Sequence, residues 1–186
     1  MDQSQPKQLE HVFSFSPGDD RYFQDCAEAL FESEQGHKYF SDLDQVKHFL
    51  QLGFAHNEIY ICTNKHHDFI GFIWANNYGA FNYFPFLQAI AVKPVFRSIG
   101  AGTFLMRQFE EAFPDAPLFF LIANPDNLGA YRFYERLGYC PVGKVPDMFI
   151  CGTTEIIMVK SRNSPNTTHK FSLYKVFRQL SLKGIL

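Results

Sequence analysis

The chain has 186 residues, 46% of them hydrophobic, which is enough for one well-buried core and too little for two full domains. Its formal net charge of -2 is unevenly distributed: residues 1–160 carry 12 Lys/Arg and 19 Asp/Glu, whereas residues 161–186 carry five Lys/Arg and no acid. Because phosphate backbones bind basic surfaces, the acidic body argues against nucleic acid as a partner.

Compartment and redox state follow from what the chain lacks. It has no run of about 18 apolar residues and no signal peptide at its N-terminus, so we expect a cytoplasmic protein without a transmembrane segment. The four cysteines, Cys26, Cys62, Cys140 and Cys151, are too far apart for a CxxC pair, and we expect reduced, mostly buried thiols.

The first half of the chain changes from helical to strand-like periodicity. We expect, in chain order, a strand at 11–16, a helix at 21–32, a loop at 34–40, a helix from 43 to a stop at Gly53, and hairpin strands at 58–63 and 69–75. His66, His67 and Asp68 lie in the hairpin connection. We interpret them as a solvated turn and expect no metal, because no second ligand pair stands at a metal-site spacing.

The second half begins with an aromatic and then aliphatic strand at 81–92, in which Pro85 predicts a bulge or a late start. The elements expected after it are a helix at 103–112, an apolar strand at 117–123, a helix at 127–137 that ends at Gly138, and strands at 140–145 and 154–159. The continuous apolar run at 117–123 is typical of a strand buried on both faces in a parallel pairing, so strand, helix and strand form a right-handed crossover.

The loop between the 81–92 strand and the next helix, Arg97-Ser98-Ile99-Gly100-Ala101-Gly102, is rich in glycine. Such a loop places free backbone N–H groups at the positive end of a helix dipole, which suits phosphate. A tight turn whose glycines relieve crowding is the alternative. The loop has neither the Gly-Lys-Ser/Thr ending of a P-loop nor the glycine spacing of a dinucleotide fingerprint.

Two motifs on these elements resemble the GNAT N-acetyltransferase superfamily. Val92-x-Pro94-x-x-Arg97-x-x-Gly100-x-Gly102 is similar to the family signature Arg/Gln-x-x-Gly-x-Gly/Ala. The second motif, similar to the family helix Asn-x-x-Ala-x-x-Phe-Tyr-x-x-x-Gly-Phe/Tyr, is Asn127-x-x-Ala130-x-x-Phe133-Tyr134-x-x-x-Gly138-Tyr139. The resemblance implies an α/β GNAT fold over residues 1–160: a central mixed, mostly antiparallel sheet with helices on both faces.

The resemblance further implies that the chain binds acetyl-CoA as a co-substrate. Loop backbone N–H groups would hold the pyrophosphate, with Arg97 adding a cation, and Asn127 would hydrogen-bond the pantetheine arm opposite the strand. The residues assigned to acetyl-CoA are Ile90, Ala91, Val92, Arg97, Ser98, Ile99, Gly100, Ala101, Gly102, Thr103, Asn127, Ala130 and Tyr134.

Catalysis is assigned to Tyr134 and Ile90 by the same resemblance. An amine would attack the thioester directly in a ternary complex, Tyr134 would protonate the departing thiolate, and the Ile90 N–H would meet the oxyanion. A core tyrosine on a helix face is the structural alternative for Tyr134.

Residues 81–92 contain no carboxylate, although some members place a glutamate base on this strand. The base is therefore left open among a water chain and the acids Glu28, Glu32, Glu58 and Asp147. The missing carboxylate also keeps open a catalytically inactive CoA-binding sensor or interaction module.

For the acceptor pocket we expect a mostly apolar slot with one or two acids, suited to a primary amine on an apolar or aromatic body. The amine could belong to a small molecule, a peptide or a protein. The residues expected near this slot are Phe31, Tyr39, Phe40, Asp147 and Phe149, with Trp74, Tyr83 and Phe84 from the strands.

The basic tail, residues 161–186, predicts an amphipathic helix over 171–182. Such a helix could lie on an anionic membrane, on the acidic body of its own chain, or on a second subunit of a homodimer.

Overall fold

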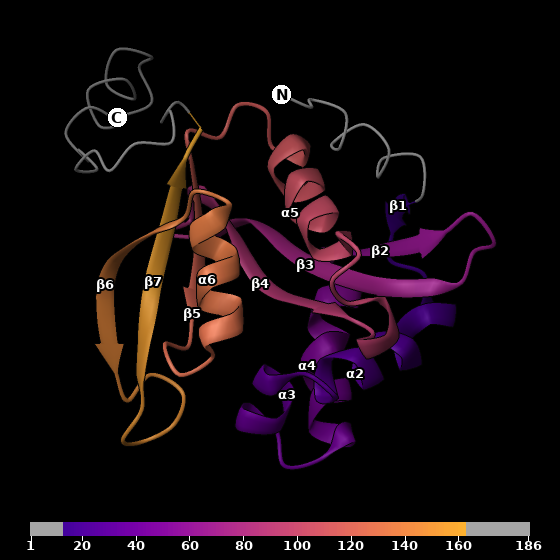
Figure 1. The fold of residues 1–186 in the computed structure, drawn as a ribbon, viewed down its shortest axis with the longest axis horizontal. Coiled ribbons are helices and arrows are strands. Elements are labelled where there is room, and N and C mark those ends of the chain that lie inside the picture. Colours follow the sequence, from indigo (N-terminus) through magenta and orange to yellow (C-terminus); the bar gives the residue numbers. More distant parts are fainter. Residues whose placement is uncertain (1–12, 163–186) are drawn as a thin grey trace.

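A computed structural model describes residues 13–162 of the chain, and its strands form a single sheet in the order β1-β2-β3-β4-β5-β7-β6 (Figure 1). Only β4 and β5 pair in parallel, and every other neighbouring pair is antiparallel. The predicted mixed, mostly antiparallel sheet is therefore confirmed. Its strands are β1 (Phe13–Pro17), β2 (Ile59–Asn64), β3 (Phe69–Ala80), β4 (Phe84–Val92), β5 (Leu118–Ala123), β6 (Cys140–Pro146) and β7 (Thr154–Ser161).

Helices cover both faces of this sheet, as predicted (Figure 1). The helices are α2 (Phe23–Phe31), α3 (Glu34–Tyr39), α4 (Leu43–Ala55), α5 (Ala101–Ala112) and α6 (Leu128–Arg136), with short 3-10 turns η1 (Asp20–Tyr22) and η2 (Pro94–Phe96). Leu105 and Phe109 of α5 belong to one core, and Leu30 of α2 and Leu50 of α4 belong to the other. Amphipathic helices thus bury one apolar stripe each against the sheet.

The parallel pair at the centre is short. Strand β4 pairs with β5 only through Phe86 and Leu87, so the remainder of β4 has no partner on that side within residues 13–162. On its other side Trp74 lies opposite Ala89 while Ala75 lies opposite Leu87, which makes Gln88 an extra, bulged residue. A bulge bends its strand, and this one lies where β4 leaves β5.

The expected irregularity at Pro85 also has a counterpart. Asn76 pairs with Phe86 and Ala80 with Phe84, so three residues of β3 lie opposite Pro85. The pairing of β4 with β3 is therefore irregular at two positions, Pro85 and Gln88, and the sequence indicated only Pro85.

Three segments differ from the sequence-based expectation. Strand β3 continues to Ala80 instead of ending at residue 75. Residues 34–39 form α3 rather than a loop, because the Ser33 hydroxyl accepts the Gly36 N–H at 2.9 Å and so caps the helix. Helix α3 also packs closely on α2, since a Cβ at Gly36 would clash with the Leu30 carbonyl oxygen. Helix α4 continues past Gly53 to Ala55, because Gly53 is needed for packing: a Cβ there would lie 2.8 Å from the Trp74 ring.

The expected thiol burial is only half right. Cys26 and Cys62 are buried free thiols, whereas Cys140 and Cys151 are exposed at the β6–β7 end of the sheet. Among residues 13–162 no helix has the length and apolar character needed to cross a membrane. The predicted tail helix over 171–182, with its proposed membrane or second-subunit contact, lies outside the described residues.

Candidate active site

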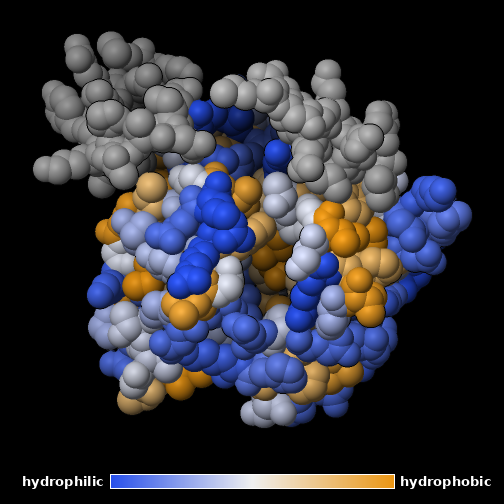
Figure 2. All heavy atoms as spheres, viewed as in Figure 1, coloured by the Kyte–Doolittle hydropathy of each residue, from blue (hydrophilic) through white to orange (hydrophobic). Residues whose placement is uncertain are grey.

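A cleft of about 600 Å³ opens where β4 separates from β5. Figure 2 shows a hollow near the centre of the face drawn, with hydrophobic residues visible inside it. Eleven of the thirteen residues assigned to acetyl-CoA line the cleft, namely Ile90, Ala91, Val92, Arg97, Ser98, Gly100, Gly102, Thr103, Asn127, Ala130 and Tyr134. The other two point elsewhere, since the Ala101 side chain is buried in the core and Ile99 is 46% exposed outside the cleft.

The glycine loop forms a backbone cradle at the N-terminus of α5. Gly100 is the N-cap in the left-handed conformation, with φ of 94°, and Ser98 also has a positive φ of 65°. Phe104 donates to the Gly100 carbonyl at 2.9 Å, so the helical hydrogen bonds begin there and the preceding N–H groups have no intrahelical partner. A Cβ at Gly102 would lie 3.3 Å from the Phe133 ring, which also lines the cleft, so glycine keeps this cradle open.

The free edge of β4 supplies a second set of backbone groups. Lys93 donates to Ile70 of β3 at 2.9 Å, and since backbone groups alternate along a strand, those of Val92 and Ile90 face the cleft. The Val92 carbonyl is already taken by Arg97 Nε at 3.1 Å, and Arg97 Nη2 donates to the Glu32 carbonyl at 3.2 Å. Arg97 therefore ties β4 to the end of α2, in addition to placing a positive charge beside the cleft.

Asn127 faces the free edge of β4 from the start of α6. Its Oδ1 accepts the Ala130 N–H at 2.9 Å and so caps the helix, which leaves its Nδ2 group available. It lines both the cleft and a second cavity of about 570 Å³.

The two cavities meet at Tyr134. They share Glu34, Gln35, Asn127, Ala130 and Tyr134 as lining residues. Tyr134 is 8% exposed, and its hydroxyl makes no hydrogen bond with any residue in 13–162. No polar side-chain atom in that range is both fully buried and without a hydrogen-bond partner, so the Tyr134 hydroxyl is accessible from the cavities. Burial raises the pKa of this phenol well above its usual value, which keeps it protonated.

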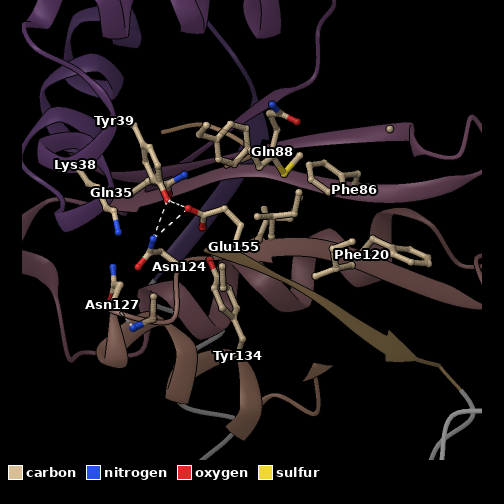
Figure 3. Close-up of a pocket in the computed structure, with 18 of the residues that line it drawn as sticks. Gln35, Lys38, Tyr39, Phe86, Gln88, Phe120, Asn124, Asn127, Tyr134 and Glu155 are labelled. Carbon is tan, nitrogen blue, oxygen red and sulfur yellow. Dashed lines mark hydrogen bonds between the residues drawn. The ribbon is translucent and has the colours of Figure 1, made fainter. Parts of the chain in front are cut away.

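Figure 3 shows a buried carboxylate in the second cavity that the sequence analysis did not assign. Glu155, the second residue of β7, is 1% exposed and accepts the Tyr39 hydroxyl at 2.5 Å and Asn124 Nδ2 at 3.1 Å. Ala123 pairs with Ile156, so the same register places Asn124 opposite Glu155, and Tyr39 reaches them from the end of α3. Burial, followed by the bond to Glu155, raises the pKa of Tyr39 well above its usual value.

The walls of this second cavity are mostly apolar, as expected, but from a different set of residues. Of the residues expected there, Tyr39 and Phe149 line it. Phe31, Phe40 and Trp74 pack in the core beneath α2 and α4, and Phe84 packs in a separate cluster near β5. The large apolar residues that do line it are Phe81, Phe86, Leu87, Phe120, Ile122, Met148, Phe149 and Ile157.

None of the four acids considered as a base lines either cavity. Glu28 accepts a hydrogen bond from Gln24, Glu58 from Trp74, and Asp147 from the Gly152 N–H of its own loop. Glu32 ends α2, and only its carbonyl approaches the cleft, through Arg97. The carboxylates of Glu28, Glu58 and Asp147 thus take part in local structure.

Solved structures with the same fold include several acetyltransferases. Ard1 from Thermoplasma volcanium is 17% identical with a TM-score of 0.67 and 81% of this chain and 97% of that chain covered. A variant of the spermidine N-acetyltransferase SpeG from Vibrio cholerae is 12% identical with a TM-score of 0.63, covering 81% and 94%. The NatC complex bound to Gag peptide and CoA contains a chain 15% identical with a TM-score of 0.61, covering 81% and 98%.

These identities are low enough that the structures show a shared fold alone. No relative of the chain is found among curated proteins. The model of the acetyltransferase (GNAT) family matches residues 21–139, well over half of the chain and both motifs, and the chain therefore belongs to the GNAT acetyltransferase family.

Proposed function

We propose that this protein transfers the acetyl group of acetyl-CoA to a primary amine by direct attack in a ternary complex. The observation that carries the proposal is the meeting of two cavities at one buried tyrosine, Tyr134. One cavity has the backbone groups for a phosphate-bearing co-substrate and the other has an apolar wall with a carboxylate. Membership of the GNAT family, which uses acetyl-CoA, and the CoA named in the NatC structure support the choice of co-substrate.

The cleft has the features that acetyl-CoA requires. The pyrophosphate would lie on the N–H groups between Ser98 and Thr103, at the positive end of the α5 dipole. The pantetheine arm would lie along the free edge of β4, with the Val92 N–H on one side and Asn127 Nδ2 on the other. Acetyl-CoA supplies an activated thioester, and the protein supplies orientation and proton transfer.

Tyr134 is the residue we assign to protonate the leaving thiolate. Its hydroxyl opens onto both cavities. A phenol carries its proton at neutral pH and can donate it to a developing thiolate. The Ile90 N–H, on the edge of β4 that faces the cleft, would donate to the thioester oxygen as negative charge develops there.

The second cavity is the acceptor site in this proposal. Its apolar walls favour an amine on an apolar or aromatic body over a polycation, since each charge left in an apolar site costs desolvation energy. Small hydrophobic amines should therefore outcompete polyamines and aminoglycosides. The opposite ranking would contradict this assignment of the cavity.

Thiol release from acetyl-CoA with a panel of primary amines tests the function. We expect turnover that requires both substrates and that falls in Tyr134→Phe. If calorimetry detects acetyl-CoA binding while every amine and peptide stays inert and Tyr134→Phe changes nothing, the protein is instead a CoA-binding sensor or interaction module.

A further inference from the structure

We propose that Glu155 binds the ammonium group of the acceptor and accepts its proton, so that the preferred acceptor is a monocationic amine on an apolar body. This inference rests on the proposed acetyl transfer, and it assigns the substrate class and the base of that same site. Three observations carry it: an unpaired buried charge, the geometry of its two oxygens, and the charge balance of the cavity.

The first observation is that Glu155 has no counter-ion among residues 13–162. Carboxylates as buried as this one are normally paired with a cation, because an unpaired buried charge is strongly destabilising. No Lys, Arg or His within residues 13–162 lies within 4.0 Å of Glu155; its two partners there, Tyr39 and Asn124, are neutral donors.

A second Tyr–Glu pair in the same protein shows the usual solution. The Tyr139 hydroxyl donates to Glu110 at 3.3 Å, and Lys160 neutralises Glu110 with contacts of 2.8 and 2.7 Å to its two oxygens. Neither Tyr139 nor Glu110 lines a described cavity. Among the described residues, the Tyr39–Glu155 pair inside the cavity has no cation to match the Lys160 of the Tyr139–Glu110 pair.

The second observation is how the Glu155 oxygens are used. Tyr39 and Asn124 both donate to Oε1, and Asn124 also donates to the Tyr39 hydroxyl at 3.1 Å, so three side chains from α3, β7 and the end of β5 hold one another (Figure 3). Oε2 takes no hydrogen bond from residues 13–162, yet no side-chain atom in that range is both fully buried and unsatisfied. Oε2 is therefore accessible from the cavity and free to accept from an ammonium group.

The third observation is the charge of the cavity as a whole. Its ionisable lining residues are Glu34, Lys38, Tyr39, Asp126, Tyr134 and Glu155. Within the part of the chain that the structure describes, Lys38 is the only cation that lines the cavity, and it is already paired with Asp126 at 3.0 Å. A cationic acceptor is thus attracted, whereas an acceptor carrying its own carboxylate meets no free positive charge from these described residues.

The proton balance of the step is simple. The acceptor R–NH3⁺ gives one proton to Glu155 and becomes R–NH2, whose lone pair forms the new N–C bond. The C–S bond breaks, Tyr134 gives its proton to the thiolate of CoA, and the surplus proton on the new amide nitrogen restores Tyr134. Glu155 then releases its proton to solvent, so the net products are the acetamide, free thiol and one proton.

The first experiment measures acceptor binding without turnover. 2-Phenylethylamine is titrated calorimetrically into the full-length protein saturated with CoA, which has no acetyl group to transfer. Glu155→Gln keeps an oxygen for Tyr39 and Asn124 and removes only the charge, and we expect binding about 10- to 100-fold weaker. The matched control, Glu110→Gln, should bind as the wild type does, and phenylalanine, which adds one carboxylate, should bind far more weakly than 2-phenylethylamine.

The second experiment measures kcat/KM for the same amine between pH 7 and 9.5. The deficit of Glu155→Gln should shrink as pH rises, because a larger fraction of the amine is already deprotonated and needs no base. A purely structural role would lower the rate by the same factor at every pH.

The outcomes separate this inference from the proposed function. The role of Glu155 is overturned by any of three results. The amine binds Glu155→Gln as tightly as it binds the wild type, the amine shows no saturable binding, or the kcat/KM deficit of Glu155→Gln is the same at every pH. If amines bind and depend on Glu155 but no acetyl group is transferred from acetyl-CoA, the proposed function fails while the ammonium site stands.

Discussion

The two cavities that meet at Tyr134 have nearly equal volumes, about 600 and 570 Å³, but they are built from different material. The cleft beside β4 is made chiefly of main chain: the N-terminus of α5, two residues with positive φ, and a strand edge left unpaired after Leu87. The second cavity is made of side chains, with a Tyr–Asn–Glu cluster among aromatic walls.

This difference predicts how each cavity responds to mutation. A backbone cradle loses function when a side chain is added to it, and most truncations in it cost little. A cavity of side chains loses function when a single polar atom is removed, because the buried partners of that atom are left unsatisfied. The predictions below test that contrast, from the largest expected effect to the smallest.

Gly102→Glu should break the cleft. The new Cβ would lie 3.3 Å from the Phe133 ring and the carboxylate would oppose the pyrophosphate, so we expect acetyl-CoA affinity at least about 1,000-fold lower. Calorimetric titration with acetyl-CoA measures the loss, and circular dichroism checks the fold. Val142→Glu places the same charge on an exposed residue of β6 and should bind normally. If Gly102→Glu binds acetyl-CoA normally, the loop is a tight turn and not a phosphate site.

Tyr134→Phe should abolish proton donation at the point where the two cavities meet and should leave the shape of both cavities unchanged. Removing the proton donor should lower kcat about 100-fold, while the dissociation constant for acetyl-CoA stays the same because the ring remains. Tyr131→Phe on the same helix α6, at a residue that lines neither cavity, is the control and should retain full kcat. If Tyr134→Phe keeps more than one third of the wild-type kcat, Tyr134 is a core residue and not the proton donor.

The raised pKa of Tyr134 also predicts a stability effect at alkaline pH. In the unfolded chain a tyrosine loses its proton near pH 10, whereas burial keeps Tyr134 protonated at that pH in the folded state. Above pH 10 the unfolded state therefore binds fewer protons, and the free energy of unfolding falls by about 1.4 kcal/mol per pH unit for this residue.

Urea unfolding between pH 9 and 11.5 measures this slope. Tyr134→Phe should make the slope less steep by about 1.4 kcal/mol per pH unit, which corresponds to one proton. Tyr78→Phe, at a 63% exposed residue of β3, is the control and should leave the slope unchanged. An identical slope in wild type and Tyr134→Phe would mean that the phenol titrates normally in the folded protein.

How far the sequence predicts each cavity follows from the same contrast. A main-chain cradle requires glycine at set positions, so Arg97-x-x-Gly100-x-Gly102 and the following Asn127–Tyr134 helix predict the cleft almost completely. What these motifs do not show is the side-chain detail, such as the use of Arg97 to tie Val92 to Glu32. Ile99 and Ala101 contribute no side chain to the cleft, because Ile99 is exposed outside it and Ala101, the first residue of α5, is buried in the core.

The second cavity is harder to predict because its residues are far apart in the chain. Tyr39, Asn124 and Glu155 come together only through the pairing of β5 with β7 and through α3, a six-residue helix whose composition is that of a loop. One signal was present: Glu155 is a lone acid inside the apolar strand Thr154–Ser161, and a charge in a buried strand usually has a function. The bulge at Gln88 has no comparable signal, since it arises from the register between β3 and β4.

Tyr39→Phe should give the smallest effect and sharpen the contrast between the two Tyr–Glu pairs. It removes one hydrogen bond to Glu155 but leaves Asn124 in place, so the carboxylate stays charged and less well oriented. One hydrogen bond contributes about 1 kcal/mol, which predicts a roughly fivefold higher KM for the amine, with the KM for acetyl-CoA unchanged. Tyr139→Phe removes the matching hydroxyl from Glu110, which Lys160 still neutralises outside both cavities, and it should change neither KM. Steady-state kinetics with 2-phenylethylamine distinguish the two variants. If both tyrosines alter the amine KM equally, the effect is one of general stability, and the cavity pair has no special part in acceptor binding.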